Sequence, residues 1–189
     1  MQIQGTNTMK ALLVIDMQKD FCYPEGALYI GNHVKGIVNA IKEVLETARG
    51  KIPIIFTQDW HRKDDSEFKI WKPHCIQNTW GAEVIDELNP SDEDYFIKKR
   101  RYSAFFGTDL DLLLRELNVD ELVVCGVVTN ICVLHTVADA VMRGYKVTVL
   151  NDCTTALNEY DYEYGIKHMK EVLRVKVISS KDLKTSFEQ

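Results

Sequence analysis

The sequence predicts a single α/β domain of three layers, with helices on both faces of a mostly parallel central sheet. Two observations predict this class. Short apolar runs typical of buried strands alternate with segments whose apolar residues recur at helical spacing. Such alternation also implies right-handed crossovers, which connect parallel strands. The predicted domain covers residues 1–189, with a core of about residues 10–180.

Six apolar runs are the predicted strands. Each is short and ends at polar or turn-forming residues. Their near-continuous hydrophobicity indicates strands that are buried on both faces, as in a parallel sheet. In chain order, the predicted strands are residues 11–15, 52–57, 95–97, 122–128, 147–150 and 175–178.

Four segments are predicted helices. The clearest begins near Val34, carries one apolar stripe and ends at Gly50, a residue type that often terminates helices. Residues 60–94 lack periodicity, and a stretch of that length in a compact domain is usually functional. The other predicted helices are residues 109–117, 130–142 and 160–173.

Composition favours a protein that acts on small molecules. The 28 acidic and 23 basic residues give a net charge of -5, and no long basic stripe suggests a nucleic acid partner. Residues 1–9 are polar and no apolar run approaches the roughly 20 residues of a membrane span, so we expect no membrane partner and a cytoplasmic location. Five cysteines without Cys-x-x-Cys spacing predict reduced thiols. Apolar residues on the later helices leave room for a homo-oligomer interface.

Polar residues follow the ends of the first four predicted strands, where ligands bind in open parallel sheets. Cys132 lies at the start of a helix, where free N–H groups and the helix dipole favour a thiolate nucleophile. The alternative is a small buried side chain, the usual fate of a free cysteine. Asp16 suits a general base with a pKa raised by partial burial, or else a turn cap. Lys99 lies in a run of four basic residues, which is usually a solvated surface.

A second group suggests a metal site. Asp59 and His61 lie two apart on the same side of an extended segment, and His74 in the long loop can complete the set. One carboxylate and two imidazoles suit Zn²⁺, Fe²⁺ or Mn²⁺. Glu67 is a candidate fourth ligand, although an isolated Asp-x-His is more often structural. His33, His135 and His168 show no such grouping and are expected to be structural or surface residues.

Aromatic residues flank the same strand ends. Several aromatic rings beside polar groups form a slot for a flat ring, although aromatic residues are more often core. The residues concerned are Phe21, Trp60, Trp71, Tyr102, Phe105 and Phe106.

Four segments together resemble the isochorismatase-like cysteine hydrolases, and most of all the nicotinamidases among them. Residues 14–21 read VIDMQKDF, 57–61 read TQDWH, 99–105 read KRRYSAF and 126–132 read GVVTNIC. The resemblance covers about residues 10–180. It implies that Asp16, Lys99 and Cys132 form the catalytic triad, and it selects Lys99 over Lys98.

The resemblance implies further features of the site. A non-proline cis peptide joins Val127 and Val128, and the N–H groups of Val128 and Cys132 form an oxyanion hole. The metal, with Zn²⁺ favoured over Fe²⁺ or Mn²⁺, binds Asp59, His61 and His74, and Glu67 resembles a glutamate that completes the shell in some members. Many relatives have a second histidine before Ser-Phe, whereas residues 62–68 read RKDDSEF here, which leaves the fourth ligand and the metal open. Phe21, Trp71 and Tyr102 line the ring slot.

The implied activity is hydrolysis of nicotinamide to nicotinate and ammonia through a cysteine thioester. The alternative within the family is a ureido or carbamoyl substrate, such as ureidoacrylate or N-carbamoylsarcosine. The metal-ligating residues favour nicotinamide, because amidases that act on ureido or carbamoyl substrates have no pyridine ring for a metal to hold. A non-catalytic thiol or metal-binding protein is a third hypothesis, and the joint presence of Asp16, Lys99 and Cys132 argues against it.

Overall fold

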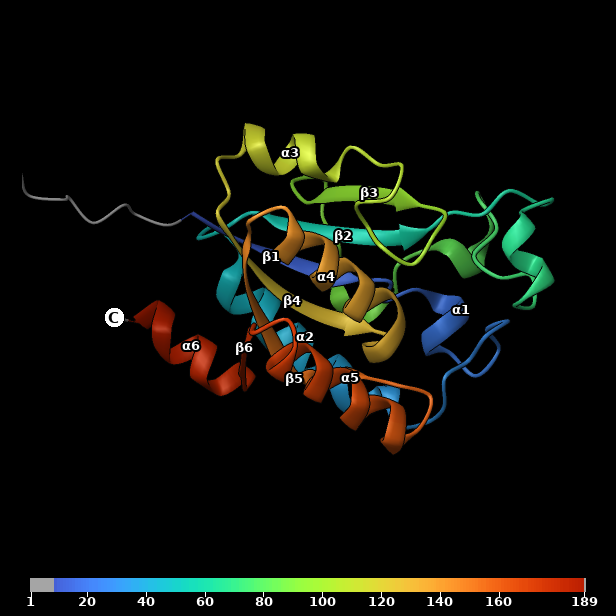
Figure 1. The fold of residues 1–189 in the computed structure, drawn as a ribbon. Coiled ribbons are helices and arrows are strands. Elements are labelled where there is room, and N and C mark those ends of the chain that lie inside the picture. Colours follow the sequence, from blue (N-terminus) through green and yellow to red (C-terminus); the bar gives the residue numbers. More distant parts are fainter. Residues whose placement is uncertain (1–8, 189) are drawn as a thin grey trace, which may run out of the picture.

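A six-stranded, all-parallel sheet in the order β3-β2-β1-β4-β5-β6 forms the centre of the computed structural model, which describes residues 9–188 (Figure 1). Residues 1–8 and 189, which the predicted domain includes, lie outside the described residues. The strands are β1 (Lys10–Ile15), β2 (Ile54–Asp59), β3 (Tyr95–Lys99), β4 (Glu121–Val127), β5 (Lys146–Thr155) and β6 (Lys176–Ile178).

Helices cover both faces of the sheet, which confirms the predicted three-layer α/β/α domain (Figure 1). Alternate residues of β1 enter different cores: Leu12 packs on the side of α2 and α6, and Leu13 on the side of α3, α4 and α5. Hydrophobic burial on both faces explains why the central strands β1 and β4 are apolar over most of their length. The helices are α2 (Val34–Ala48), α3 (Leu110–Glu116), α4 (Leu134–Met142), α5 (Glu159–Glu171) and α6 (Ser180–Glu188).

The strand order creates a topological switch point between β1 and β4. From β1 the chain adds β2 and β3 on one side, and then returns to place β4, β5 and β6 on the other. Connections that leave neighbouring strands in opposite directions open a crevice at their carboxyl ends, where ligands bind. Asp16 directly follows β1 and Cys132 follows β4, so the fold brings both residues to this crevice.

Some element boundaries differ from the prediction. β2 begins at Ile54 rather than at residue 52, because the Ile52 N–H still bonds to the Ala48 carbonyl of α2 and Pro53 has no N–H to donate. β5 continues beyond residue 150 to Thr155, through the exposed Asn151 and Asp152 and across a register shift opposite β4. The helix predicted at residues 130–142 starts as a π turn, Thr129–Val133, before α4. The short helix α1 (Lys19–Cys22) and α6 were not predicted.

The long segment of residues 60–94 forms three short 3₁₀ turns, at Ser66–Lys69, Trp80–Ala82 and Asp86–Leu88. It begins at the carboxyl end of β2 and returns to the amino end of β3, so its first part lies beside the crevice. Within residues 9–188, no helix combines the length and the hydrophobicity that crossing a membrane would require.

Candidate active site

Asp16 ends β1 in a left-handed conformation, with φ of 50°. Such a backbone angle is unusual for a residue with a side chain and is often found at functional sites. The turn directs a fully buried carboxylate toward β2, where Thr57 Oγ1 donates a hydrogen bond of 2.6 Å to Asp16 Oδ1. The hydroxyl therefore holds one carboxylate oxygen, and the other lies 2.8 Å from the Lys99 ammonium.

Gly126 allows β4 to approach this turn closely. Its φ is 110°, and a Cβ at this position would lie 2.1 Å from the carbonyl oxygen of Ile15. No side chain fits there, so only glycine lets β4 pass the end of β1 at this distance. The cis peptide expected between Val127 and Val128 is present, and the π turn that carries Cys132 follows it. Val128 and Cys132 both line the cavity described below.

Lys99, the last residue of β3, connects the polar groups at the strand ends. Its fully buried ammonium lies 2.8 Å from Asp16 Oδ2, 2.5 Å from Asp59 Oδ1 and 3.3 Å from Cys132 Sγ. It also donates to the carbonyl of Arg101 at 3.0 Å. Lys98 points elsewhere, with its ammonium 3.9 Å from the centroid of the Trp60 ring. The run of basic residues is thus only partly a solvated surface.

The charges of these groups depend on burial and on each other. Burial raises the pKa of the Cys132 thiol well above its ordinary value, and the nearby ammonium of Lys99 only partly opposes this effect. Desolvation of the sulfur thus opposes the effect of the helix start, on which the expected thiolate depends. Burial likewise raises the pKa of Asp16, against the opposing charge of Lys99. A buried thiol next to a carboxylate needs that carboxylate as its proton acceptor.

Asp59, His61 and His74 form a compact group of metal-ligating atoms, all within 4.8 Å of one another. Asp59 Oδ2 lies 3.6 Å from His61 Nε2 and 3.5 Å from His74 Nε2. Among the residues that the structure describes, His61 Nε2 is buried without a hydrogen-bond partner. A carboxylate and two imidazole nitrogens are donors that suit a divalent transition metal, and an unpartnered buried nitrogen fits such an ion.

Glu67 lies at the edge of this group. Its Oε1 is 3.8 Å from His61 Nε2, and burial raises the pKa of its carboxyl. The remaining histidines have other contacts. His33 Nε2 lies 2.7 Å from the Ala156 carbonyl, the His168 ring lies beside Tyr164, and the His135 ring centroid lies 5.3 Å from that of Tyr102. These positions fit the structural roles expected of them.

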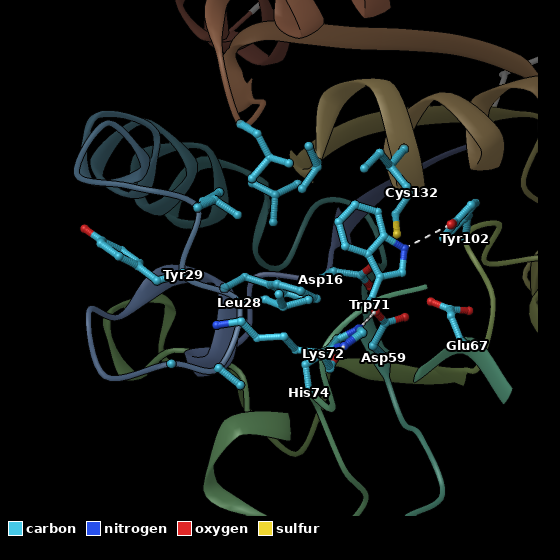
Figure 2. Close-up of a pocket in the computed structure, with 18 residues that line it drawn as sticks. Asp16, Leu28, Tyr29, Asp59, Glu67, Trp71, Lys72, His74, Tyr102 and Cys132 are labelled. Carbon is cyan, nitrogen blue, oxygen red and sulfur yellow. Dashed lines mark hydrogen bonds and ion pairs between the residues drawn. The ribbon is translucent and has the colours of Figure 1, made fainter. Parts of the chain in front are cut away.

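One cavity of about 270 Å³ is lined by Asp16 and Cys132 and by three candidates of the metal group, Asp59, Glu67 and His74, whereas Lys99 and His61 lie behind its wall (Figure 2). Trp71 Nε1 donates a 3.0 Å hydrogen bond to the Tyr102 hydroxyl, so the two aromatic side chains from distant segments form one wall. Phe21 lies 5.6 Å from the His74 ring, measured between centroids. All three residues of the expected ring slot line the cavity, whereas Trp60, Phe105 and Phe106 do not. The segment of residues 26–30 and Leu157, which the sequence did not suggest, also contribute.

Two residues of the first motif support the site in ways that the sequence did not predict. Gln18 binds the backbone of Asp59 twice, accepting from its N–H at 2.8 Å and donating to its carbonyl at 2.9 Å. Asp20 accepts from the N–H groups of Ala27 and Cys75 at 2.9 and 2.7 Å. The available signal was their spacing from Asp16, two and four residues further along the chain. Their partners lie too far away in sequence to be foreseen.

Comparison with known proteins places this architecture in a family. Residues 10–182 match the isochorismatase domain. The chain belongs to the isochorismatase family. A hydrolase of this family from Alkaliphilus metalliredigens superposes with a TM-score of 0.91 at 35% identity, covering 95% of this chain and 100% of that one. Its similarity across the whole fold agrees with the three-layer architecture described above.

Solved amidases are similar over the same length. The nicotinamidase/pyrazinamidase PncA from Bacillus subtilis has a TM-score of 0.86 at 32% identity, over 91% of this chain and 100% of that one. A pyrazinamidase from Pyrococcus horikoshii, solved in complex with zinc, has a TM-score of 0.84 at 33% identity, over 90% of this chain and 98% of that one. The chain is therefore a hydrolase of the isochorismatase family with nicotinamidases among its relatives.

Other relatives have different activities. A ureidoacrylate amidohydrolase, RutB from Caulobacter vibrioides, is 34% identical over 76% of this chain and 76% of its own length. A protein from Arabidopsis thaliana described as a probable inactive nicotinamidase is 38% identical over 86% of this chain and 88% of its own length. Relatives that act on different substrates are about equally identical to this chain. The substrate must therefore be argued from the site.

Proposed function

We propose that this hydrolase converts nicotinamide to nicotinate and ammonia through a thioester on Cys132. The observation that carries the proposal is that one small cavity is lined by Cys132 and also by Asp59 and His74 of the metal-ligating group. Nicotinamide has two functional ends, a carboxamide and a ring nitrogen. A cavity with a thiol and a metal-ligating group can bind both ends, and its small volume suits a single aromatic ring.

Acylation requires a base, a nucleophile and a site for negative charge. Asp16 accepts the thiol proton as Cys132 Sγ attacks the carboxamide carbon. The N–H groups of Val128 and Cys132 donate to the oxyanion, and the buried ammonium of Lys99 stabilises the anionic groups around it. As the C–N bond breaks, Asp16 returns its proton to the departing nitrogen, which leaves as ammonia.

Deacylation uses the same groups in reverse. Asp16 takes a proton from a water molecule as the water oxygen attacks the thioester carbon, and the C–S bond then breaks. The thiolate of Cys132, 3.3 Å from the Lys99 ammonium, regains a proton from Asp16. This transfer returns Asp16 and Cys132 to their starting protonation states. The released acid ionises to nicotinate.

Asp59, His61 and His74 would hold a divalent metal, with Glu67 as a fourth candidate, and Zn²⁺ is our first choice over Fe²⁺ or Mn²⁺. Bound there, such an ion would supply a Lewis acid for the ring nitrogen. Phe21, Trp71 and Tyr102 orient the ring by contact with its faces and edge, which directs the carboxamide toward Cys132. Orientation of this kind contributes to rate by presenting the carbonyl carbon to the sulfur.

The experiment that tests the substrate is ammonia release from nicotinamide, pyrazinamide, ureidoacrylate and N-carbamoylsarcosine, with metal analysis of the same preparation. We expect the highest kcat/KM for nicotinamide, with pyrazinamide also accepted and one divalent metal per chain. Faster and metal-independent turnover of ureidoacrylate, the substrate of one relative, would contradict the proposal. Ammonia release from none of the four amides would favour a non-catalytic role.

A further inference from the structure

Asp65 is a buried carboxylate with no place in the catalytic scheme. It lies in the long loop between β2 and β3 and is 4% exposed. Arg100 Nε donates to Oδ2 at 2.8 Å, and Arg101 Nη1 donates to Oδ1 at 3.0 Å. The N–H of Glu67 donates to Oδ1 at 3.1 Å, and His61 Nδ1 lies 3.1 Å from Oδ2. A carboxylate with so many donors is held in one orientation.

The contact with His61 bears on the metal site. Nδ1 and Nε2 lie on different sides of an imidazole ring, and His61 Nε2 faces Asp59 Oδ2 at 3.6 Å. A carboxylate at Nδ1 favours the tautomer with its proton on Nδ1, so that Nε2 keeps the lone pair that a metal needs. His74 receives equivalent support from a backbone group, because its Nδ1 lies 2.6 Å from the Lys72 carbonyl. Only the support of His61 therefore depends on a side chain.

Arg100 and Arg101 explain how Asp65 can stay charged without binding the metal itself. Both guanidinium groups form ion pairs with the buried carboxylate, Arg100 at 2.8 Å and Arg101 at 3.0 Å, and so balance its charge. Arg101 also donates to Ser66 Oγ at 3.0 Å. The two arginines thus attach the loop to the segment that follows Lys99 at the end of β3.

We propose that Asp65 is a positioning residue for the metal site, which fixes the tautomer and orientation of His61 and is itself held by Arg100 and Arg101. This inference rests on the metal site of the proposed function. It assigns a role to two arginines that otherwise belong to an ordinary basic surface run. The neighbouring Asp64 differs, since it is exposed and forms an ion pair with Arg62.

The test is zinc affinity of the metal-free protein, measured by competition with a chromogenic chelator. Asp65→Ala is expected to weaken zinc binding about 10–100-fold, the usual effect of removing such an outer partner. Asp65→Asn keeps an acceptor oxygen for His61 Nδ1 but not the charge, so it should lose less. Asp64→Ala is the matched control and should bind zinc as the wild type does. Wild-type affinity in Asp65→Ala would overturn the proposal.

A second readout separates positioning from general loss of structure. Cobalt(II) bound to Asp65→Asn should show an altered absorption spectrum, because the His61 ligand is held differently, while Asp64→Ala keeps the wild-type spectrum. If Asp65→Ala does not fold, Asp65→Asn decides, and an unchanged affinity and spectrum in it would overturn the inference. His61→Ala distinguishes the two proposals. Wild-type zinc affinity in that variant means the metal site itself is wrong, whereas loss of zinc there but not in the Asp65 variants refutes only the role of Asp65.

Discussion

Lys99 donates a hydrogen bond to the sulfur of Cys132 at 3.3 Å, although β3, which ends at Lys99, and β4, which precedes Cys132, are separated in the sheet by β2 and β1. The lysine side chain spans this gap past the carboxylates at the ends of the two intervening strands, Asp59 and Asp16. One buried cation therefore contacts the candidate base, the candidate nucleophile and a candidate metal ligand. Its loss should affect all three.

Lys99→Ala should therefore lower kcat about 100-fold or more and also destabilise the protein. Removing the ammonium leaves two buried carboxylates without their partner, which typically costs about 3–5 kcal/mol of folding free energy. Lys98→Ala is the matched control, because it removes only a cation–π contact with Trp60 worth about 0.5–1 kcal/mol. Steady-state kinetics and urea unfolding measure both effects. Equal losses in the two variants would mean that the wrong lysine was chosen.

His61→Ala should lose bound metal and raise KM for nicotinamide more than it lowers kcat. The proposed role of the metal is to hold the ring nitrogen, so its loss removes binding before it removes chemistry. His168→Ala is the control, because this histidine lies on α5 beside Tyr164. Metal analysis and kinetics on both variants check the prediction. Full metal occupancy in His61→Ala would exclude the proposed ligand set.

Gly126→Ala should destabilise the protein more than Gly50→Ala. Both glycines have positive φ, 110° and 73°, so both substitutions carry a backbone penalty of about 1–2 kcal/mol. A Cβ at residue 50 meets nothing within 4 Å, whereas at residue 126 it would lie 2.1 Å from Ile15 O. Urea unfolding should show the additional cost, and activity should fall because β4 moves away from Asp16. Similar unfolding free energies would show that the close approach is unimportant.

As the pH is lowered, kcat/KM should fall with an apparent pKa higher than the ordinary aspartate value of about 3.9. Burial raises the pKa of Asp16 despite the charge of Lys99, and the carboxyl must be ionised to accept the thiol proton. Activity is then lost as pH falls through this raised pKa. Metal content must be measured at each pH, since the imidazole ligands also take up protons in acid. A fully metal-loaded enzyme with its acid limb at or below about 3.9 would contradict the assignment.

The sequence pattern was sufficient to predict the three layers and the positions of Asp16, Asp59 and Cys132, whereas the choice of Lys99 over Lys98 came from the resemblance to the family. Each follows an apolar strand, and parallel strands bring their carboxyl ends together, so pattern and topology determine the place of these residues. The outer part of β5 was missed because its polar residues interrupt the apolar run that identifies a strand. A register shift against β4, which accommodates them, leaves no local signal.

Supporting contacts were harder to predict than the central residues. Gln18 and Asp59 lie 41 positions apart, and Asp65 and Arg101 lie 36 apart, so no local pattern relates them. The basic run was expected to be solvated, and Arg100 and Arg101 are partly exposed, but the pattern did not show that both bind Asp65. The place of Cys132 at a helix start was visible in the sequence, whereas the extent of its burial, which raises the pKa of its thiol, was not.

The most direct test of the proposed mechanism is to trap the acyl-enzyme. Wild-type protein mixed with nicotinamide, quenched in acid during turnover and digested, should give a nicotinoyl thioester on the peptide that contains Cys132, as detected by mass spectrometry. Cys132→Ala should give neither adduct nor ammonia while still binding nicotinamide, and Cys153→Ala should behave as the wild type. Substantial ammonia release by Cys132→Ala, or an adduct on another cysteine, would contradict the nucleophilic role of Cys132.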